Sequence, residues 1–137
     1  MDRASFVWEL RLWLILSAAR RRRVVHHVEL AEELAPLVDL PPARVEDLLH
    51  DALAEIERYE SAAGRPMLTS LVVSSISGVV TDGYVACARS LGHQVDDSPE
   101  GRVAFWESQC QQVYACWAAP DGPAVTDEPD VAAAPAR

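Results

Sequence analysis

Acidic and histidine side chains one helical turn apart are the first groups in this sequence that could do chemistry. Glu46 and His50 are four positions apart, and so are Asp47 and Asp51, so each pair shares one face of a helix. Such pairs can bind a divalent cation or act in acid–base catalysis. Acidic helix faces are also common as solvated surfaces, and we favour that interpretation over a metal site.

Histidine and cysteine do not form a zinc-type ligand set. His26 and His27 are adjacent in a short β-branched segment, where neighbouring side chains point to opposite faces, so both cannot reach one ion. Cys87 and His93 are separated by the expected end of a helix, and no second pair of ligands accompanies them. We therefore predict that the protein holds no metal ion.

The carboxylates of Asp82, Asp96, Asp97 and Glu100 would suit a nuclease, but the rest of a nuclease centre is missing. The sequence has no lysine, which the usual carboxylate-plus-lysine centre needs, and no asparagine, which removes the His-Asn-His type. It has no glycine-rich phosphate loop, and no Ser-His-Asp grouping stands out. We predict a protein that is not an enzyme and takes no cofactor. A metal-dependent hydrolase that uses Asp82 or His50 is a minor alternative.

Composition and charge exclude further classes of function. The chain has 137 residues, of which 50% are hydrophobic and 24% are charged, and its net charge is −9. General nucleic-acid coating and binding to anionic membranes both rely on surplus positive charge, so neither is expected. Arginine supplies all 12 basic residues. Because lysine and asparagine codons are rich in adenine, their absence favours a GC-rich genome, such as that of an actinobacterium or one of its phages.

The apolar run over residues 6–19 could be mistaken for a signal peptide or a membrane span. Little positive charge precedes it, four arginines follow it, and Glu9 and Arg11 lie inside it, which is the wrong pattern for a signal peptide. The run is also too short to cross a bilayer. The three cysteines include no CxxC pair and cannot form a closed disulfide framework, which favours a reducing compartment. We expect a cytoplasmic protein that does not interact with membranes.

Hydrophobic periodicity predicts a mainly helical α+β fold with a small β-hairpin. Helices are expected over residues 4–20, 28–37, 41–63, 84–91 and 98–117, and strands over residues 24–27, 68–74 and 79–80. The first six elements follow the order helix, strand, helix, helix, strand, strand, which matches a winged helix-turn-helix. We therefore predict a winged helix-turn-helix-like core followed by two carboxyl-terminal helices.

One domain is expected over residues 1–117, and a flexible acidic tail rich in alanine and proline over residues 118–137. In the last helix, apolar residues recur at spacings of three and four, which predicts a face directed to the core. Its members are Val103, Trp106, Cys110, Val113 and Trp117.

Two parts of the sequence resemble known families. Residues 28–34 (VELAEEL), followed by Leu40-Pro41-Pro42, resemble the "YGELA…GLPP" segment of winged-helix proteins, among them the DNA-binding half of alkyltransferase-like proteins. Residues 53–73 and 105–117 resemble a small bacterial and phage family whose members read "EI…YE…GRPLLSALVV…G…G…ARELG…FW…VY…W". The resemblance spans residues 24–117 and implies a winged-helix fold, while the activity of that family is not settled.

The sequence departs from these patterns in ways that bear on function. His27-Val28 stands where the winged-helix pattern has Tyr-Gly, and the hairpin, often basic in relatives, carries no charge over residues 74–78. The reactive Pro-Cys-His-Arg motif of true alkyltransferases is missing, which excludes alkyl transfer.

Specific DNA binding would need a recognition helix in the major groove and basic side chains at the flanking phosphates. The helix over residues 41–63 offers Arg44, but its exposed side is acidic and would repel phosphate. The acidic residues of that side are Glu46, Asp47, Asp51 and Glu55. They form a solvated surface, face a basic partner, or imitate the charge of DNA.

The basic cluster follows the first helix and consists of Arg20, Arg21, Arg22 and Arg23. These arginines either complement the dipole of the helix end and stay solvated, or contact phosphate or an acidic partner. A DNA-binding transcriptional regulator would use this cluster together with Arg44. We keep that function as the alternative and do not favour it.

The first helix carries more apolar surface than a single core needs. Trp8, Leu12 and Leu16 form a second apolar face on it. This face either contacts a partner, as in a homodimer through the first helix, or is covered by the two carboxyl-terminal helices.

Together these observations predict a non-enzymatic adaptor or regulator that binds another protein through a winged-helix-like scaffold. The residues expected to contact the partner are Trp8, Leu12, Leu16, Asp47, Asp51 and Glu55. The resemblance favours a phage or bacterial-defence setting.

Overall fold

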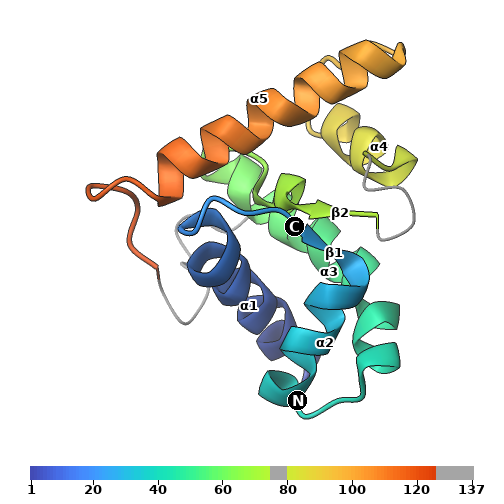
Figure 1. Cartoon of the computed structure of the whole chain (residues 1–137), viewed down its shortest axis with the longest axis vertical. Helices are drawn as coiled ribbons and strands as arrows, with labels where there is room; N and C mark the ends of the chain where they lie inside the picture. Colours follow the sequence, from blue (N-terminus) through green and yellow to red (C-terminus); the bar gives the residue numbers. More distant parts are fainter. Residues whose placement is uncertain (75–79, 126–137) are drawn as a thin grey trace.

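The computed structural model describes residues 1–74 and 80–125, and helices dominate this part of the chain (Figure 1). Helix α1 (Arg3–Trp13) continues into the π-helix η1 (Leu14–Ala19), followed by strand β1 (Val25–His26) and helices α2 (His27–Val38) and α3 (Pro42–Ala62). The 3₁₀ helix η2 (Leu68–Leu71) leads into strand β2 (Val72–Val73), and helices α4 (Asp82–Ser90) and α5 (Pro99–Trp117) complete the order. The prediction of a mainly helical α+β fold is confirmed.

The two strands pair in parallel, with Val25 opposite Val72 and His26 opposite Val73. The predicted strand over residues 68–74 is therefore wrong for its first half, which forms η2. The return strand predicted at residues 79–80 is not found at Val80, and residues 75–79 lie outside the described residues. The predicted hairpin is thus not observed in the described part of the chain.

Side chains, rather than a neighbouring strand, satisfy the backbone around η2. The N–H of Met67 donates to Gln109 Oε1 at 3.0 Å, and the N–H of Thr69 donates to Glu57 Oε1 at 3.0 Å. The carbonyl of Ser70 accepts from Trp106 Nε1 at 2.7 Å. Because buried backbone groups must find partners, these three bonds stabilise the turn over residues 68–71.

Helix α1 is buried on most sides by the chain itself. Residues in successive turns of α1 contact residues in successive turns of α3. Arg3 pairs with Glu55, and the ring of Trp8 packs edge-on against that of Tyr59, with ring centres 5.1 Å apart. Trp8 is 8% exposed and Leu10 is fully buried. The all-round apolar composition of this helix therefore reflects burial between α2, α3 and the end of α5.

Helix α5 crosses one end of the molecule and meets the core along its carboxyl-terminal half (Figure 1). Cys110, Val113 and Trp117 are buried as predicted, but Val103 is 40% exposed and Trp106 is half-buried. The predicted core face is wrong for Val103, because the first half of α5 extends past the main core toward α4. A smaller apolar cluster joins this half of α5 to α4 and consists of Met67, Val85, Ala88 and Val95, with Tyr84 and Phe105 beside it.

The predicted tail begins inside the described residues. Residues 118–125 are described, and Val125 packs against the main core. Residues 126–137 lie outside the described residues.

A buried carboxylate lies at the centre of the core. Glu60 is 0% exposed, and its Oε2 is 3.0 Å from Arg11 Nε while its Oε1 is 2.9 Å from Arg65 Nε. The Arg11 guanidinium, itself 3% exposed, lies 4.7 Å from the Trp8 ring centre and 5.4 Å from that of Trp117. Two guanidinium groups thus compensate a carboxylate that would otherwise be costly to bury, and the aromatic rings stabilise the buried guanidinium of Arg11.

Replacement of this carboxylate should cost much of the stability of the fold. We expect Glu60→Gln to lower the free energy of unfolding by about 3 to 5 kcal/mol, because two arginines then lose their counter-charge. Urea denaturation at neutral pH measures the change. The control is Arg3→Gln, which removes the exposed pair with Glu55 and should cost less than about 1 kcal/mol. Equal effects of the two substitutions would contradict this role for Glu60.

Candidate functional site

The acidic side of α3 is exposed as the sequence indicated. Glu46, Asp47 and Asp51 are exposed, and none of the ion pairs within residues 1–74 and 80–125 involves them. Glu55 differs, because its Oε2 accepts a hydrogen bond from Arg3 Nε at 3.2 Å. The acidic surface therefore runs along the first two-thirds of α3 and ends beside the start of α1.

The arginine cluster is divided between solvent and the protein. Arg23 lies 3.4 Å from Glu33 and packs over the Trp13 ring at 5.5 Å, while Arg22 lies 5.8 Å from the ring centre of Tyr114. Arg20 and Arg21 are exposed. Arg44 is also exposed and belongs to the first turn of α3, on a different element.

The three apolar residues proposed for partner contact have different surroundings. Trp8 is 8% exposed and stacks edge-on with Tyr59, Leu12 is half-buried, and Leu16 is 41% exposed. Exposed apolar surface therefore supports partner contact by Leu16 but not by Trp8. A homodimer through the first helix stays a prediction.

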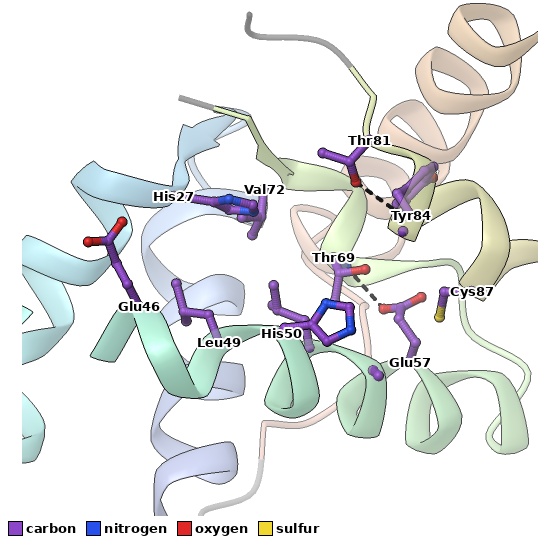
Figure 2. Close-up of a pocket in the computed structure, with 13 residues that line it drawn as sticks. His27, Glu46, Leu49, His50, Glu57, Thr69, Val72, Thr81, Tyr84 and Cys87 are labelled. Carbon is purple, nitrogen blue, oxygen red and sulfur yellow. Dashed lines mark hydrogen bonds between the residues drawn. The ribbon is translucent and has the colours of Figure 1, made fainter. Parts of the chain in front are cut away.

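A cavity of about 220 Å³ lies between α3 and α4, and α2, η2 and β2 also contribute residues to its lining (Figure 2). Apolar walls come from Leu49, Leu53 and Ala54 of α3 and from Val72 of β2. The polar and ionisable groups around it are His27, Glu46, His50, Glu57, Thr69, Thr81, Tyr84 and Cys87. The structure thus brings Glu46 and His50 to one cavity with residues from four other elements.

Glu57 is the residue at this site that the sequence analysis did not identify. It is 1% exposed; its Oε1 accepts from the Thr69 N–H, and its Oε2 has no hydrogen-bond partner among the described residues. Burial and, to a lesser extent, the nearby carboxylate of Glu60 raise the pKa of Glu57 to about 8, against the opposing effect of the Thr69 hydrogen bond. Glu57 is therefore mostly a neutral acid at pH 7.

A sequence signal for the buried carboxylates does exist. Glu57 and Glu60 continue the series Leu49, Leu53 at spacings of four and three, so they extend a partly apolar side of the helix. That side lies next to the predicted core face, and burial of its end follows from the packing of η2 and α4 on it.

Other histidines and cysteines stay apart. His27 lines the cavity, and burial lowers its pKa, whereas His26 is exposed and its Nδ1 lies 3.2 Å from the Ser74 carbonyl oxygen. Cys87 lines the cavity, but His93 packs on Phe105 with ring centres 5.4 Å apart. Within the described residues, no group of three or more His, Cys, Asp and Glu side chains is arranged to hold a metal ion.

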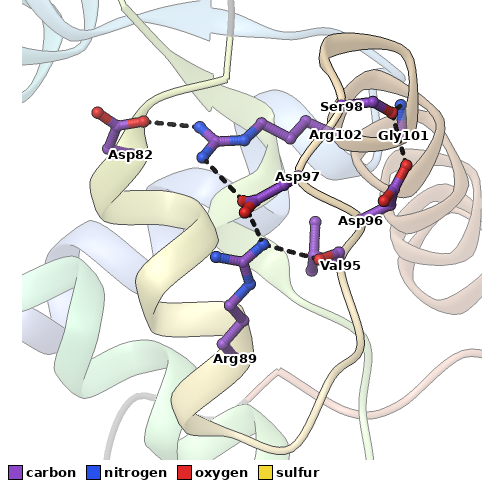
Figure 3. Close-up of polar contacts among 8 residues, drawn as sticks. All are labelled: Asp82, Arg89, Val95, Asp96, Asp97, Ser98, Gly101 and Arg102. Atoms are coloured by element: carbon purple, nitrogen blue, oxygen red, sulfur yellow. Dashed lines mark hydrogen bonds and ion pairs between the residues drawn. The ribbon is translucent and has the colours of Figure 1, made fainter.

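Helix α4, which forms one wall of the cavity, is held by polar contacts at both of its ends. Tyr84 shares a 2.6 Å hydrogen bond with Ser70 of η2, and Thr81 Oγ1 caps the helix by accepting from the Tyr84 N–H. Arg102 of α5 donates to Asp82 at 2.6 Å, and Arg89 donates to Asp97 and to the Val95 carbonyl, each at 2.8 Å (Figure 3).

Three of the four carboxylates that could have suited a nuclease have structural partners, whereas Glu100 is exposed. Asp82 and Asp97 pair with arginines, and Asp96 accepts from the Ser98 hydroxyl at 2.6 Å (Figure 3). Arg89 and then Arg102 lower the pKa of Asp97 by hydrogen bonding and charge. Ser98 in turn caps α5 by accepting from the Gly101 N–H at 3.0 Å.

No family model, no curated protein and no solved structure matches this chain. The resemblance to winged-helix proteins and to a small phage and bacterial family therefore stays a prediction. No helix among the described residues combines the length and the apolar character that crossing a membrane requires.

Removal of the buried acid should change the pH dependence of stability. The unfolded chain loses the Glu57 proton above about pH 4.5. The folded chain keeps this proton until about pH 8. The contribution of Glu57 to the free energy of unfolding is therefore complete below pH 4.5. It is lost as the pH rises to 8, by about 1 kcal/mol per pH unit. We expect Glu57→Gln to remove this slope in urea denaturation between pH 5 and 8.

The matched control for that experiment is Asp51→Asn, which neutralises an exposed carboxylate of the same helix and should keep the wild-type slope. Parallel pH profiles for wild type and Glu57→Gln would show that Glu57 is ionised in the folded protein at neutral pH.

A glycine substitution tests the α4–α5 junction. A β-carbon at Gly101 would lie 2.6 Å from Asp96 Cβ and 2.9 Å from Ser98 Oγ. We expect Gly101→Ala to lower the midpoint of thermal unfolding, although alanine is the better helix former by about 1 kcal/mol. The control is Gly83→Ala in the first turn of α4, where the nearest atom would be 3.8 Å away. That variant should be neutral or stabilised, and equal midpoints for the two would contradict the packing at Gly101.

Proposed function

We propose that this protein is a non-enzymatic regulator that acts by binding another protein, with the acidic side of α3 as the contact surface. The observation that carries the proposal is the exposure of Asp47 and Asp51 without a counter-charge among the described residues, beside Glu55. A partner with an arginine- or lysine-rich segment would supply the missing positive charge. The net charge of −9 would also speed its approach by electrostatic steering.

We further propose a winged-helix-like scaffold for this function. The order of the elements α1, β1, α2, α3 and β2 supports it. In such a scaffold α3 takes the place of the recognition helix. Its acidic residues would repel DNA phosphates at that place, and this supports a protein partner. The sequence resemblance supports a phage or bacterial-defence setting, and the absence of lysine and asparagine supports a GC-rich genome.

A DNA-binding regulator is the second candidate. Arg20, Arg21 and Arg44 are exposed, and no ion pair among the described residues involves them, so they are available to contact phosphate. Arg20 and Arg21 follow η1, whereas Arg44 lies in the first turn of α3, and the exposed side of that helix presents mainly carboxylates.

Capture of a partner by the immobilised full chain tests the proposal. Wild type should capture a stoichiometric protein from a nuclease-treated extract of a GC-rich bacterial host. The variant Asp47→Asn/Asp51→Asn should capture at least about tenfold less of that protein, because charge pairs at interfaces contribute on this scale. The control Glu32→Gln/Glu107→Gln makes the same charge change at exposed sites on α2 and α5 and should capture as much as wild type.

Binding of a labelled random DNA duplex at low salt, followed by fluorescence anisotropy, decides between the two candidates. The protein-binding proposal predicts no duplex binding. Salt-dependent duplex binding that is lost in Arg20→Ala/Arg21→Ala/Arg44→Ala, with no captured protein after nuclease treatment, would replace the proposal with the DNA-binding function.

A further inference from the structure

We propose that the cavity between α3 and α4 is a binding site for a small organic amine, with its ammonium group at Glu57 and its hydrocarbon part between the two helices. This site lies apart from the exposed carboxylates Asp47 and Asp51, neither of which lines the cavity, so the inference does not depend on the protein-binding function. Three independent features of the cavity carry it: its size, its unpartnered buried oxygen and the sign of its charges.

The cavity has the size of a compact molecule. A dry cavity of about 150 Å³ is enough to hold a benzene ring, and this one measures about 220 Å³. A six-membered ring that carries an aminomethyl group therefore fits. Leu49, Leu53, Ala54 and Val72 supply apolar walls for such a ring, and the burial of its surface would favour binding.

The buried Oε2 of Glu57 is the group that would bind the polar end of the ligand. Figure 2 shows the carboxyl group of Glu57 between Thr69 and Cys87 in the cavity, with one oxygen bonded to the Thr69 backbone. The other oxygen, Oε2, is buried and has no hydrogen-bond partner among the described residues. Native proteins rarely leave a buried carboxyl oxygen in this state. An ammonium group would give it a charge-assisted hydrogen bond, which is stronger than a bond between neutral groups.

The charges around the cavity favour a cation over an anion. Its lining includes two carboxyl groups, Glu46 and Glu57, and no arginine. Burial lowers the pKa of His27, so this side chain is neutral at pH 7 and does not oppose a cation. An anion would meet no arginine among the lining residues, whereas an ammonium group would meet the carboxyl group of Glu57.

Binding of an amine should release a proton. The empty site holds Glu57 as a neutral acid at pH 7, and an ammonium group beside Oε2 would stabilise its carboxylate form, so the proton of Glu57 passes to the buffer. The titratable groups that face Glu57 are Glu60 and His50 on α3 and Tyr84 and Cys87 on α4, with His27 of α2 across the cavity. Burial raises the pKa of Tyr84 and of Cys87, so both stay protonated at pH 7.

Isothermal titration calorimetry of the full chain at pH 7 and 150 mM salt tests the site with three amines and their alcohols of the same skeleton. The pairs are benzylamine with benzyl alcohol, cyclohexylamine with cyclohexanol, and butylamine with butanol. At least one amine should bind at least about tenfold more tightly than its alcohol, a difference of about 1.4 kcal/mol. The observed enthalpy should also differ between phosphate and HEPES buffers, because about one proton is released to the buffer for each amine bound.

Variants separate this site from general attraction of cations to an acidic protein. Glu57→Gln keeps a neutral group of the same shape, so the fold should persist, and the preference for amine over alcohol should disappear. Ala54→Leu narrows the cavity and should weaken amine and alcohol alike. The control Asp51→Asn removes one exposed negative charge on the same helix and should bind as wild type does.

Three results would overturn the inference. The first is that no amine binds with a Kd below about 10 mM, because a weaker Kd corresponds to almost no affinity. The second is equal affinity for amines and alcohols, which would assign the cavity to neutral ligands. The third is equal loss of amine binding in Asp51→Asn and Glu57→Gln, which would show that the amines bind to surface charge.

Discussion

The carboxylate of Glu60 is the constraint on which the rest of the structure depends. It is fully buried between Arg11 of α1 and Arg65, which follows α3, and an uncompensated charge at this place would be very unfavourable. Both arginines must therefore reach it, and Arg11 does so with Trp8 and Trp117 packed on its guanidinium. This requirement sets the position of α1 along α3 and brings the end of α5 to the same point.

Helix α3 then serves three different environments at once. Val45, Ala52 and Ile56 face the core, Leu53 and Glu57 face the cavity below α4, and Asp47 lies in solvent. A helix of 21 residues can do this because successive side chains turn by about 100°. The proposed protein surface and the proposed amine site are therefore parts of one helix: Asp47 and Asp51 lie outside the cavity, whereas Glu46 lines it.

The turn at η2 links the fold to the cavity. Glu57 uses one oxygen to hold the Thr69 N–H, while Trp106 and Gln109 hold neighbouring backbone groups. The same contacts stabilise the turn over residues 68–71, while the second oxygen of Glu57 is buried and has no hydrogen-bond partner among the described residues. Helix α4 closes that space through Tyr84, which is bonded to Ser70 of the turn.

The sequence by itself determined the elements whose signals are local. Periodicity places the helices, Ser98 and Thr81 cap α5 and α4 as their types suggest, and the exposed acidic side of α3 follows from its spacing. Tertiary structure alone decided that residues 68–71 turn, that Val103 is exposed, and that Arg11, Glu57 and Glu60 are buried. The reason is physical: propensity and periodicity act over a few residues, whereas the partners that allow a charge or a bare backbone group to be buried come from residues that are distant in the sequence.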